Sequence, residues 1–233
     1  MKKLIGDNNK AAIADRGDKL AKARKASIDA LLANATIGWD ASPISTARMC
    51  AEVYAQIKDD DWSLVGTSVG LVWPRMLWNM DKPHRWNGGS GGGGVGYNAP
   101  ASLGAALANK KHGRLTVSLQ GDGDFMMCPG TLWTAAHHGI PILYVMVNNR
   151  AWHQEYMYLQ AMAGRHQRGA RNTRIGTTIT DPDIDYANLA RSFGVYGEGP
   201  ISDPKDLGPA LKRALAVVRK GEPALIDVVT DPR

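Results

Sequence analysis

Two apolar runs that each stop at a short polar motif constrain this chain most. Residues 115–120 (LTVSLQ) lead into GDG at 121–123, and residues 141–147 (PILYVMV) lead into the asparagine pair at 148–149. Residues 129–138, between the runs, have a proline near their start and a glycine just beyond their end, which is typical of a helix. The segment therefore predicts two neighbouring parallel strands joined by a helix.

The rest of the chain alternates expected helices with expected strands. Ser45 precedes one helix, and its hydroxyl can accept a free amide of the first turn. Residues 163–180 are polar, basic and loop-like. The expected helices are 10–33, 46–57, 97–110, 188–193 and 207–219, and the further strands are 62–67 and 224–229. This alternation predicts an α/β fold, a doubly wound parallel sheet with helices on both faces. We expect a helix and linker over 1–42 and one domain over 43–233.

Composition excludes several classes of function. The net charge is +6 and the pI is about 9.3, which fits either an ordinary basic surface or an anionic ligand. No run of five Lys or Arg occurs and aromatic residues make up 7%, so we expect no nucleic-acid partner. No apolar stretch reaches the ~18 residues that a membrane span needs, and the first residues do not resemble a signal peptide. Two cysteines without a CxxC motif favour a reducing cytoplasm.

Polar side chains follow the two predicted neighbouring strands. Asp122 comes just after the first strand and Asn149 just after the second. Because parallel strands end at the same edge of a sheet, the carboxylate and the amide should converge there, with the carbonyl of Ala151 as a third oxygen. Mg²⁺ prefers such oxygens and often completes its shell with phosphates. Gly121 and Gly123 leave room for a phosphate against the backbone. The motifs therefore predict a magnesium–diphosphate clamp.

GDG followed 24 residues later by NN resembles the signature of the thiamine diphosphate (ThDP) enzymes. Three further segments are similar to the diphosphate-binding domain of the acetolactate synthase, benzoylformate decarboxylase and 2-hydroxyacyl-CoA lyase group. They are NGGSGGGGVGYNAPASLGAALA, DPDIDYANLARSFGV and the closing PALIDVVTD. The resemblance covers about residues 43–231 and implies ThDP and Mg²⁺ as cofactors.

The resemblance also implies further cofactor contacts. The Gly93 carbonyl would accept a bond from the 4′-amino group, and Val95 would be the apolar wedge that bends the cofactor, although a larger residue is usual there. Thr67 and Ser68 would contact the diphosphate, or they are ordinary turn residues. Asp124 stands where a small residue is common. A carboxylate repels diphosphate, so we expect only its backbone amide to face the phosphate.

Candidate substrate contacts follow the asparagine pair. His153 is a candidate general acid or base because the ordinary pKa of histidine lies near neutrality. Residues 163–174 (AGRHQRGARNTR) carry four arginines and form either a solvated loop or a clamp for an anionic substrate. Trp73, Trp78 and Trp86 either line an apolar pocket or simply pack.

In the family that the chain resembles, a glutamate on a separate pyrimidine-binding domain activates the cofactor. This chain has no room for that domain, which needs at least ~150 further residues. The chain is therefore either a fragment or, as we expect, half of a split enzyme in a heterotetramer or larger assembly. On that expectation the isolated chain is inactive.

The expected reaction is non-oxidative cleavage or formation of a C–C bond. The small-molecule substrate would be a 2-oxo acid or an acyl-CoA of the 2-hydroxyacyl type, acted on by a decarboxylase, a lyase or an acyloin synthase. One alternative is the diphosphate-binding subunit of a 2-oxo acid oxidoreductase, although its usual cysteines and TGGQ segment are missing here. Another is a non-catalytic ThDP-binding subunit.

Overall fold

A computed structural model describes residues 6–67, 71–88 and 94–231. The chain divides into two compact units, residues 1–37 and 38–233. The first unit contains one long helix, α1 (Asp7–Ala35), which carries lysine–aspartate pairs at i,i+4 spacing such as Lys19 with Asp15. No helix among the described residues combines the length and the apolar character that a membrane crossing requires.

The second unit is built on a five-stranded sheet in the order β1-β2-β3-β5-β4, with every neighbouring pair parallel. The strands are β1 (Trp62–Thr67), β2 (Leu115–Gly121), β3 (Leu143–Asn148), β4 (Tyr196–Ile201) and β5 (Ala224–Val229). The predicted pairing of the two apolar runs is confirmed, because β2 and β3 are hydrogen-bonded neighbours. The predicted doubly wound α/β fold is confirmed as well.

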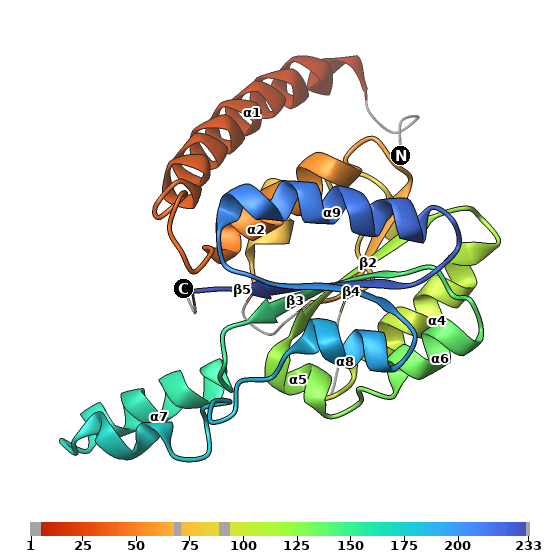
Figure 1. Ribbon diagram of the computed structural model, residues 1–233. Coiled ribbons are helices and arrows are strands. Elements are labelled where there is room, and N and C mark those ends of the chain that lie inside the picture. Colours follow the sequence, from red (N-terminus) through yellow and green to blue (C-terminus); the bar gives the residue numbers. More distant parts are fainter. Residues whose placement is uncertain (1–5, 68–70, 89–93, 232–233) are drawn as a thin grey trace. The chain divides into compact units, whose positions relative to one another are not determined.

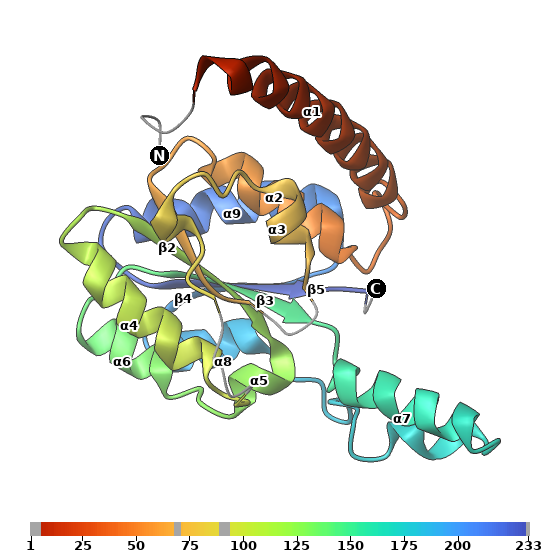
Figure 2. The same cartoon turned by 180° about the vertical axis from the view of Figure 1, so that it is seen from behind.

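Helices cover both faces of the sheet (Figures 1 and 2). One face packs on α2 (Thr46–Ile57) and α9 (Pro204–Val218), and the other on α4 (Asn98–Lys110), α5 (Asp122–Met126), α6 (Thr131–His137) and α8 (Tyr186–Ser192). Strand β3 shows why both faces are apolar. Val145 and Val147 belong to the first core cluster, whereas Tyr144 and Met146 belong to the second. Alternate side chains point to opposite faces, so a strand buried on both sides reads as a continuous apolar run.

A local signal in the sequence explains where α2 begins. The hydroxyl of Ser45 accepts a hydrogen bond from the backbone N–H of Arg48 at 3.2 Å, which confirms the predicted cap of α2.

Trp78 is buried, stacks on Tyr54 with ring centroids 5.6 Å apart, and donates its indole N–H to the Cys50 carbonyl at 2.9 Å. Trp73 and Trp86 pack against the same core cluster. The three tryptophans therefore serve packing.

Strand β4, an edge strand with the sequence YGEGPI, is not predicted by its sequence pattern. Glycine and proline are depleted in strands, and proline is tolerated mainly at edges, so the segment gave no strand signal. The glycines are needed for close packing. A Cβ at position 197 would stand 2.2 Å from the Ala187 carbonyl oxygen of α8, and one at position 199 would stand 2.5 Å from the Asp227 carbonyl oxygen of β5.

An arm extends from the end of β3. It consists of helix α7 (His153–Arg165) and a 3-10 turn, η3 (Ala170–Arg174), which pack on each other. Figure 1 shows α7 running outward from the body of the second unit, and none of its residues is buried. The short helix α3 (Trp73–Leu77) and the turn η2 (Pro83–Arg85) complete the described elements. The sequence does not predict α7, because its polar and apolar residues lack a clear helical stripe.

Candidate functional site

The carboxyl ends of β2 and β3 bring Asp122 and Asn149 together. Gly121, the last residue of β2, pairs in register with Val147 of β3, so both motifs leave the sheet at the same level. One backbone amide joins them. The N–H of Ala151 lies 3.2 Å from Oδ2 of Asp122 and 3.1 Å from Oδ1 of Asn149. The three residues predicted as metal ligands thus meet at one point on the sheet edge.

The loop after β3 turns sharply at Arg150. Its φ is 58°, a left-handed conformation that is uncommon for a residue other than glycine and that returns Ala151 toward β2. The loop is also tied to the chain beyond the arm. Trp152 donates its N–H to the Thr177 carbonyl at 2.8 Å, and Ile179 donates to the Arg150 carbonyl at 2.7 Å. Segment 177–179 therefore fixes the loop that carries Asn149 and Ala151.

The two asparagines of the pair have different partners. The amide of Asn148 donates to Oδ1 of Asp227 on β5 at 3.0 Å, inside the protein. The backbone N–H of Tyr186 lies 3.3 Å from the other oxygen of Asp227. Because the Asn148 side chain is hydrogen-bonded to Asp227 on β5, its neighbour Asn149 supplies the side chain that faces Asp122.

Asp122 is a buried acid, 2% exposed, at the first position of α5. Burial raises its pKa to about 6, against the lowering effect of backbone N–H donors at Gly123 and Ala151. A carboxylate costs free energy in such a place unless a cation meets it. Oxygens of a carboxylate, an amide and a backbone carbonyl are the ligand set that Mg²⁺ takes when phosphates complete the shell, so the donor chemistry fits that cation.

Position 123 must be a glycine because the indole of Trp152 packs against it. A Cβ at this position would stand 2.7–2.9 Å from carbons of the Trp152 indole, so the ring lies directly on the GDG turn. Beneath the turn, the Tyr186 hydroxyl donates to the Asp122 carbonyl at 3.1 Å. No sequence motif predicts the roles of Trp152 and Tyr186, because their contacts with the GDG motif form only when distant segments of the chain fold together.

The carboxylate of Asp124 binds residues just after the glycine-rich segment. Oδ1 accepts from the Gly96 N–H at 2.6 Å and Oδ2 accepts from the Asn98 amide at 3.0 Å. Asn98 also donates to the carbonyl of Thr67, at the end of β1, at 3.3 Å. Val95, next to Gly96, is 54% exposed. Gly93 and Ser68, the other predicted cofactor contacts, lie outside the described residues.

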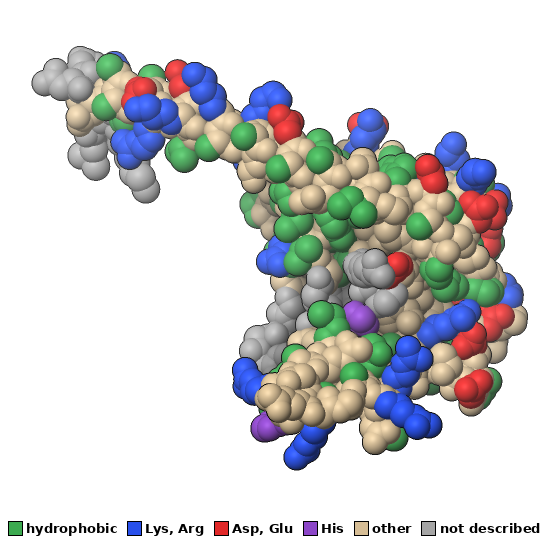
Figure 3. Space-filling model, turned by 90° about the vertical axis from the view of Figure 1, so that its left-hand side faces the viewer, with side chains coloured by type: hydrophobic (Ala, Val, Ile, Leu, Met, Phe, Trp, Pro, Cys, Tyr) green, Lys and Arg blue, Asp and Glu red, His purple; other side chains and the backbone are tan. Residues whose placement is uncertain are grey.

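His153 begins α7, two residues after Ala151, and its ring centroid lies 6.3 Å from that of Tyr156. The Nδ1 atom of His153 is shielded from solvent and has no hydrogen-bond partner among the described residues. The arginines of segment 163–174 are exposed and form no ion pair within the described structure. They are Arg165, Arg168, Arg171 and Arg174. Figure 3, which faces the side on which α7 projects, shows basic side chains around the arm.

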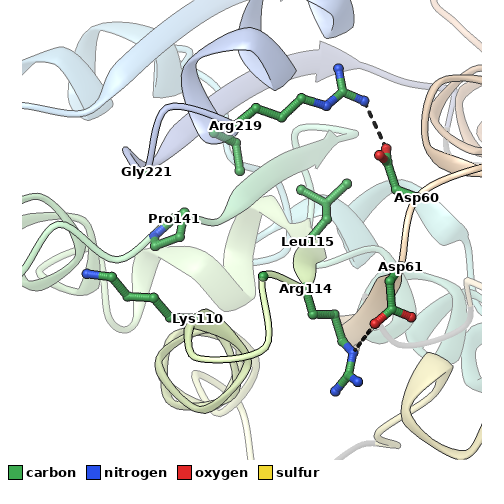
Figure 4. A pocket seen from close by; sticks show the side chains of 10 residues that line it. Asp60, Asp61, Lys110, Arg114, Leu115, Pro141, Arg219 and Gly221 are labelled. Carbon is green, nitrogen blue, oxygen red and sulfur yellow. Dashed lines mark hydrogen bonds and ion pairs between the residues drawn. The ribbon is translucent and has the colours of Figure 1, made fainter.

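A separate cavity of about 340 Å³ lies at the opposite, amino-terminal edge of the sheet (Figure 4). Four of its charged lining residues form two ion pairs, and Lys110 donates to the Gly139 carbonyl at 2.9 Å. Arg219 contacts Asp60 at 2.8 Å, and Arg114 contacts Asp61 at 3.0 Å. These pairs neutralise both acids, and the cavity is remote from the carboxyl edge that carries Asp122.

Comparison with known proteins places this geometry in context. Residues 65–228 match the family model described as the C-terminal TPP-binding domain of thiamine pyrophosphate enzymes. The chain is 28% identical over 200 residues to a probable acetolactate synthase large subunit of Methanocaldococcus jannaschii, covering 83% of this chain and 32% of that protein. It is 31% identical over 162 residues to the acetolactate synthase isozyme 3 large subunit of Escherichia coli, covering 67% and 25%. The chain thus spans about a third or less of the length of these relatives.

Solved structures agree. A ThDP-dependent 4-hydroxybenzoylformate decarboxylase of Rhodococcus jostii superposes with a TM-score of 0.68 at 26% identity, over 82% of this chain and 33% of that one. A benzoylformate decarboxylase of Polynucleobacter necessarius superposes with a TM-score of 0.65 at 20% identity, over 80% and 33%, which supports the fold alone.

Proposed function

Because this chain belongs to the thiamine pyrophosphate enzymes through their C-terminal TPP-binding domain, we propose that it binds the diphosphate of ThDP together with Mg²⁺. The observation that carries this proposal is the junction of Asp122, Asn149 and Ala151 at one sheet edge. The carboxylate, the amide oxygen and the Ala151 carbonyl would be the protein ligands of the cation, and phosphate oxygens would complete its shell.

The remaining proposed cofactor contacts rest on the resemblance of the sequence to the ThDP enzymes. The proposed diphosphate contacts are Gly121, Gly123, the backbone of Asp124, Thr67 and Ser68. Gly93 and Val95 are the proposed contacts of the aminopyrimidine ring. The exposure of Val95 supports its role, since an apolar side chain facing solvent beside the Asp124 carboxylate is available to pack on a ring.

The proposed reaction is the non-oxidative cleavage or formation of a C–C bond in a 2-oxo acid or a 2-hydroxyacyl-CoA type substrate. When bound, ThDP supplies the nucleophilic carbon for such chemistry, and the protein supplies orientation and electrostatics. The names of the relatives, acetolactate synthases and benzoylformate decarboxylases, support this class. His153, two residues beyond Ala151, is the proposed proton donor and acceptor for the substrate.

We further propose that a pyrimidine-binding domain on a partner subunit supplies the activating glutamate, in a cytoplasmic hetero-oligomer. One observation supports a partner at this edge. Helix α7, which begins at the site, has no buried residue. The isolated chain should then bind the cofactor weakly and turn over no substrate.

Reconstitution of the complete enzyme tests this function. The chain alone and the chain with its co-purified partner would be assayed with ThDP and Mg²⁺ against 2-oxo acids and 2-hydroxyacyl-CoA esters. Turnover should appear only in the complex. His153→Gln should lower the rate about 10²- to 10⁴-fold, with ThDP binding retained. The control, His112→Gln, changes a histidine in the turn after α4 and should have no effect. Full turnover by the isolated chain would refute the partner, and an active His153→Gln enzyme would refute the role of His153.

A further inference from the structure

The side chain of Asp124 connects two parts of the chain that lie far apart in the sequence. Its Oδ1 accepts from the Gly96 N–H at 2.6 Å and its Oδ2 accepts from the Asn98 amide at 3.0 Å. Both bonds end on a carboxylate, and such charge-assisted bonds are short and comparatively strong. We call Asp124, Gly96 and Asn98 the Asp124 latch.

The latch is closely packed as well as hydrogen-bonded. Gly96 is buried with φ +87°, and a Cβ there would stand 2.7 Å from Cβ of Met127, just past the end of α5. Asn98 is buried and also reaches the end of β1, through the Thr67 carbonyl. The latch therefore links the start of α4, the end of β1 and the residues just after the GDG motif through hydrogen bonds and close packing.

The position of the latch gives it a functional meaning. Asp124 lies two residues after Asp122, the proposed cation ligand, and Gly96 follows Val95, the proposed ring contact. A ligand held at both places can span only a limited range of distances, so the separation between the two places must stay within that range. A misplacement of about 1 Å in such a site commonly costs a large factor in binding or rate.

We propose that Asp124 is a positioning residue that sets the distance between the diphosphate-binding turn and the segment that holds the aminopyrimidine. This rests on the proposed function. It explains a carboxylate beside a diphosphate site, because the Asp124 oxygens are turned to the Gly96 and Asn98 donors. It also extends the role of Asp124 beyond its backbone amide.

The latch itself is tested in the chain alone, by amide hydrogen exchange. Asp124→Ala should speed exchange at the Gly96 amide about tenfold or more, because its acceptor is lost. The amides of β3 should keep their protection. Asp60→Ala is the matched control, since it removes an acid at the opposite sheet edge and should leave Gly96 unchanged. Unchanged exchange at Gly96 in Asp124→Ala would overturn the latch.

Positioning is tested in the complete enzyme with two probes and Mg²⁺. Asp124→Ala should weaken ThDP about tenfold or more, yet change the affinity for inorganic pyrophosphate less than about twofold, because the cation ligands are untouched. Equal losses for both probes, or no loss for ThDP, would overturn the proposal. Wild-type enzyme that binds neither probe would instead overturn the proposed function and, with it, this role for Asp124.

A conservative change guards against simple misfolding. Asp124→Asn keeps the shape of the side chain, and its Oδ1 can still accept from the Gly96 N–H, but its amide faces the amide of Asn98, donor against donor. ThDP affinity should therefore fall although the protein stays folded. A folded Asp124→Asn enzyme that binds ThDP at wild-type strength would contradict the latch.

Discussion

The indole of Trp152 lies directly on Gly123, so closely that a methyl group at that glycine would enter the ring. Gly123 follows Asp122 in the chain, and Trp152 follows Ala151. The contact therefore joins the neighbours of two proposed cation ligands. The two halves of the proposed cation site therefore pack against each other.

Gly123→Ala should destabilise the protein. The added Cβ would stand 2.7 Å from the indole, and overpacking of this kind costs about 1–3 kcal/mol. Gly104→Ala is the control, because nothing lies within 4 Å of its Cβ position on α4, and it should stabilise by about 0.5–1 kcal/mol. Urea unfolding measures both. Equal stabilities for Gly123→Ala and wild type would show that Trp152 does not occupy this place.

Asp227 should make stability depend on pH. Burial raises its pKa to about 6, above the ordinary value of 3.8, even though Asn148 and Tyr186 donate to it. A raised folded-state pKa means that the stabilisation is complete below pH ~4 and is lost as pH rises through ~6. Asp227→Asn removes the titration, so its stability relative to wild type should improve by about 1–3 kcal/mol between pH 4 and pH 8. Unfolding curves at both values check this, and a difference that does not change with pH would contradict it.

The arginines of segment 163–174 should bind an anionic substrate and leave cofactor binding unaffected. Arg168→Ala combined with Arg171→Ala removes two exposed cations that no carboxylate neutralises in the described structure. In the complete enzyme KM should rise about tenfold with kcat and ThDP affinity unchanged, since binding of ground state and transition state weakens equally. Arg16→Ala with Arg24→Ala on α1 is the charge-matched control. If KM does not change in the double variant, these arginines do not bind substrate and belong to a solvated loop.

The sheet and the convergence at its edge could be predicted from local signals. Continuous apolar runs mark strands buried on both faces, and the GDG and NN motifs sit where those strands end. Asp122, Asn149 and Ala151 could be named because strand ends in a parallel sheet share one edge. Ser45 could be named as a cap for an equally local reason.

Other parts could not be predicted, because their causes are tertiary. Strand β4 is specified by the close approach of Gly197 and Gly199 to α8 and β5, which no local pattern reveals. Trp152 and Asp227 act through contacts with residues 29 and 79 positions away in the chain. From the sequence, the carboxylate of Asp124 could be expected only to point away from the phosphate. Its partners, Gly96 and Asn98, lie 28 and 26 positions away and could not be named without the structure.

The most direct test of the central claim is the affinity for ThDP in the complete enzyme, measured by calorimetry with Mg²⁺ and with EDTA. Wild type should bind only with Mg²⁺, and Asp122→Ala or Asn149→Ala should lose about 100-fold or more in affinity, because each removes a proposed cation ligand. Asp183→Ala, which removes the exposed partner of Arg150, is the control and should bind normally. Binding of ThDP at wild-type strength by Asp122→Ala, or binding by wild type that EDTA does not weaken, would contradict the account.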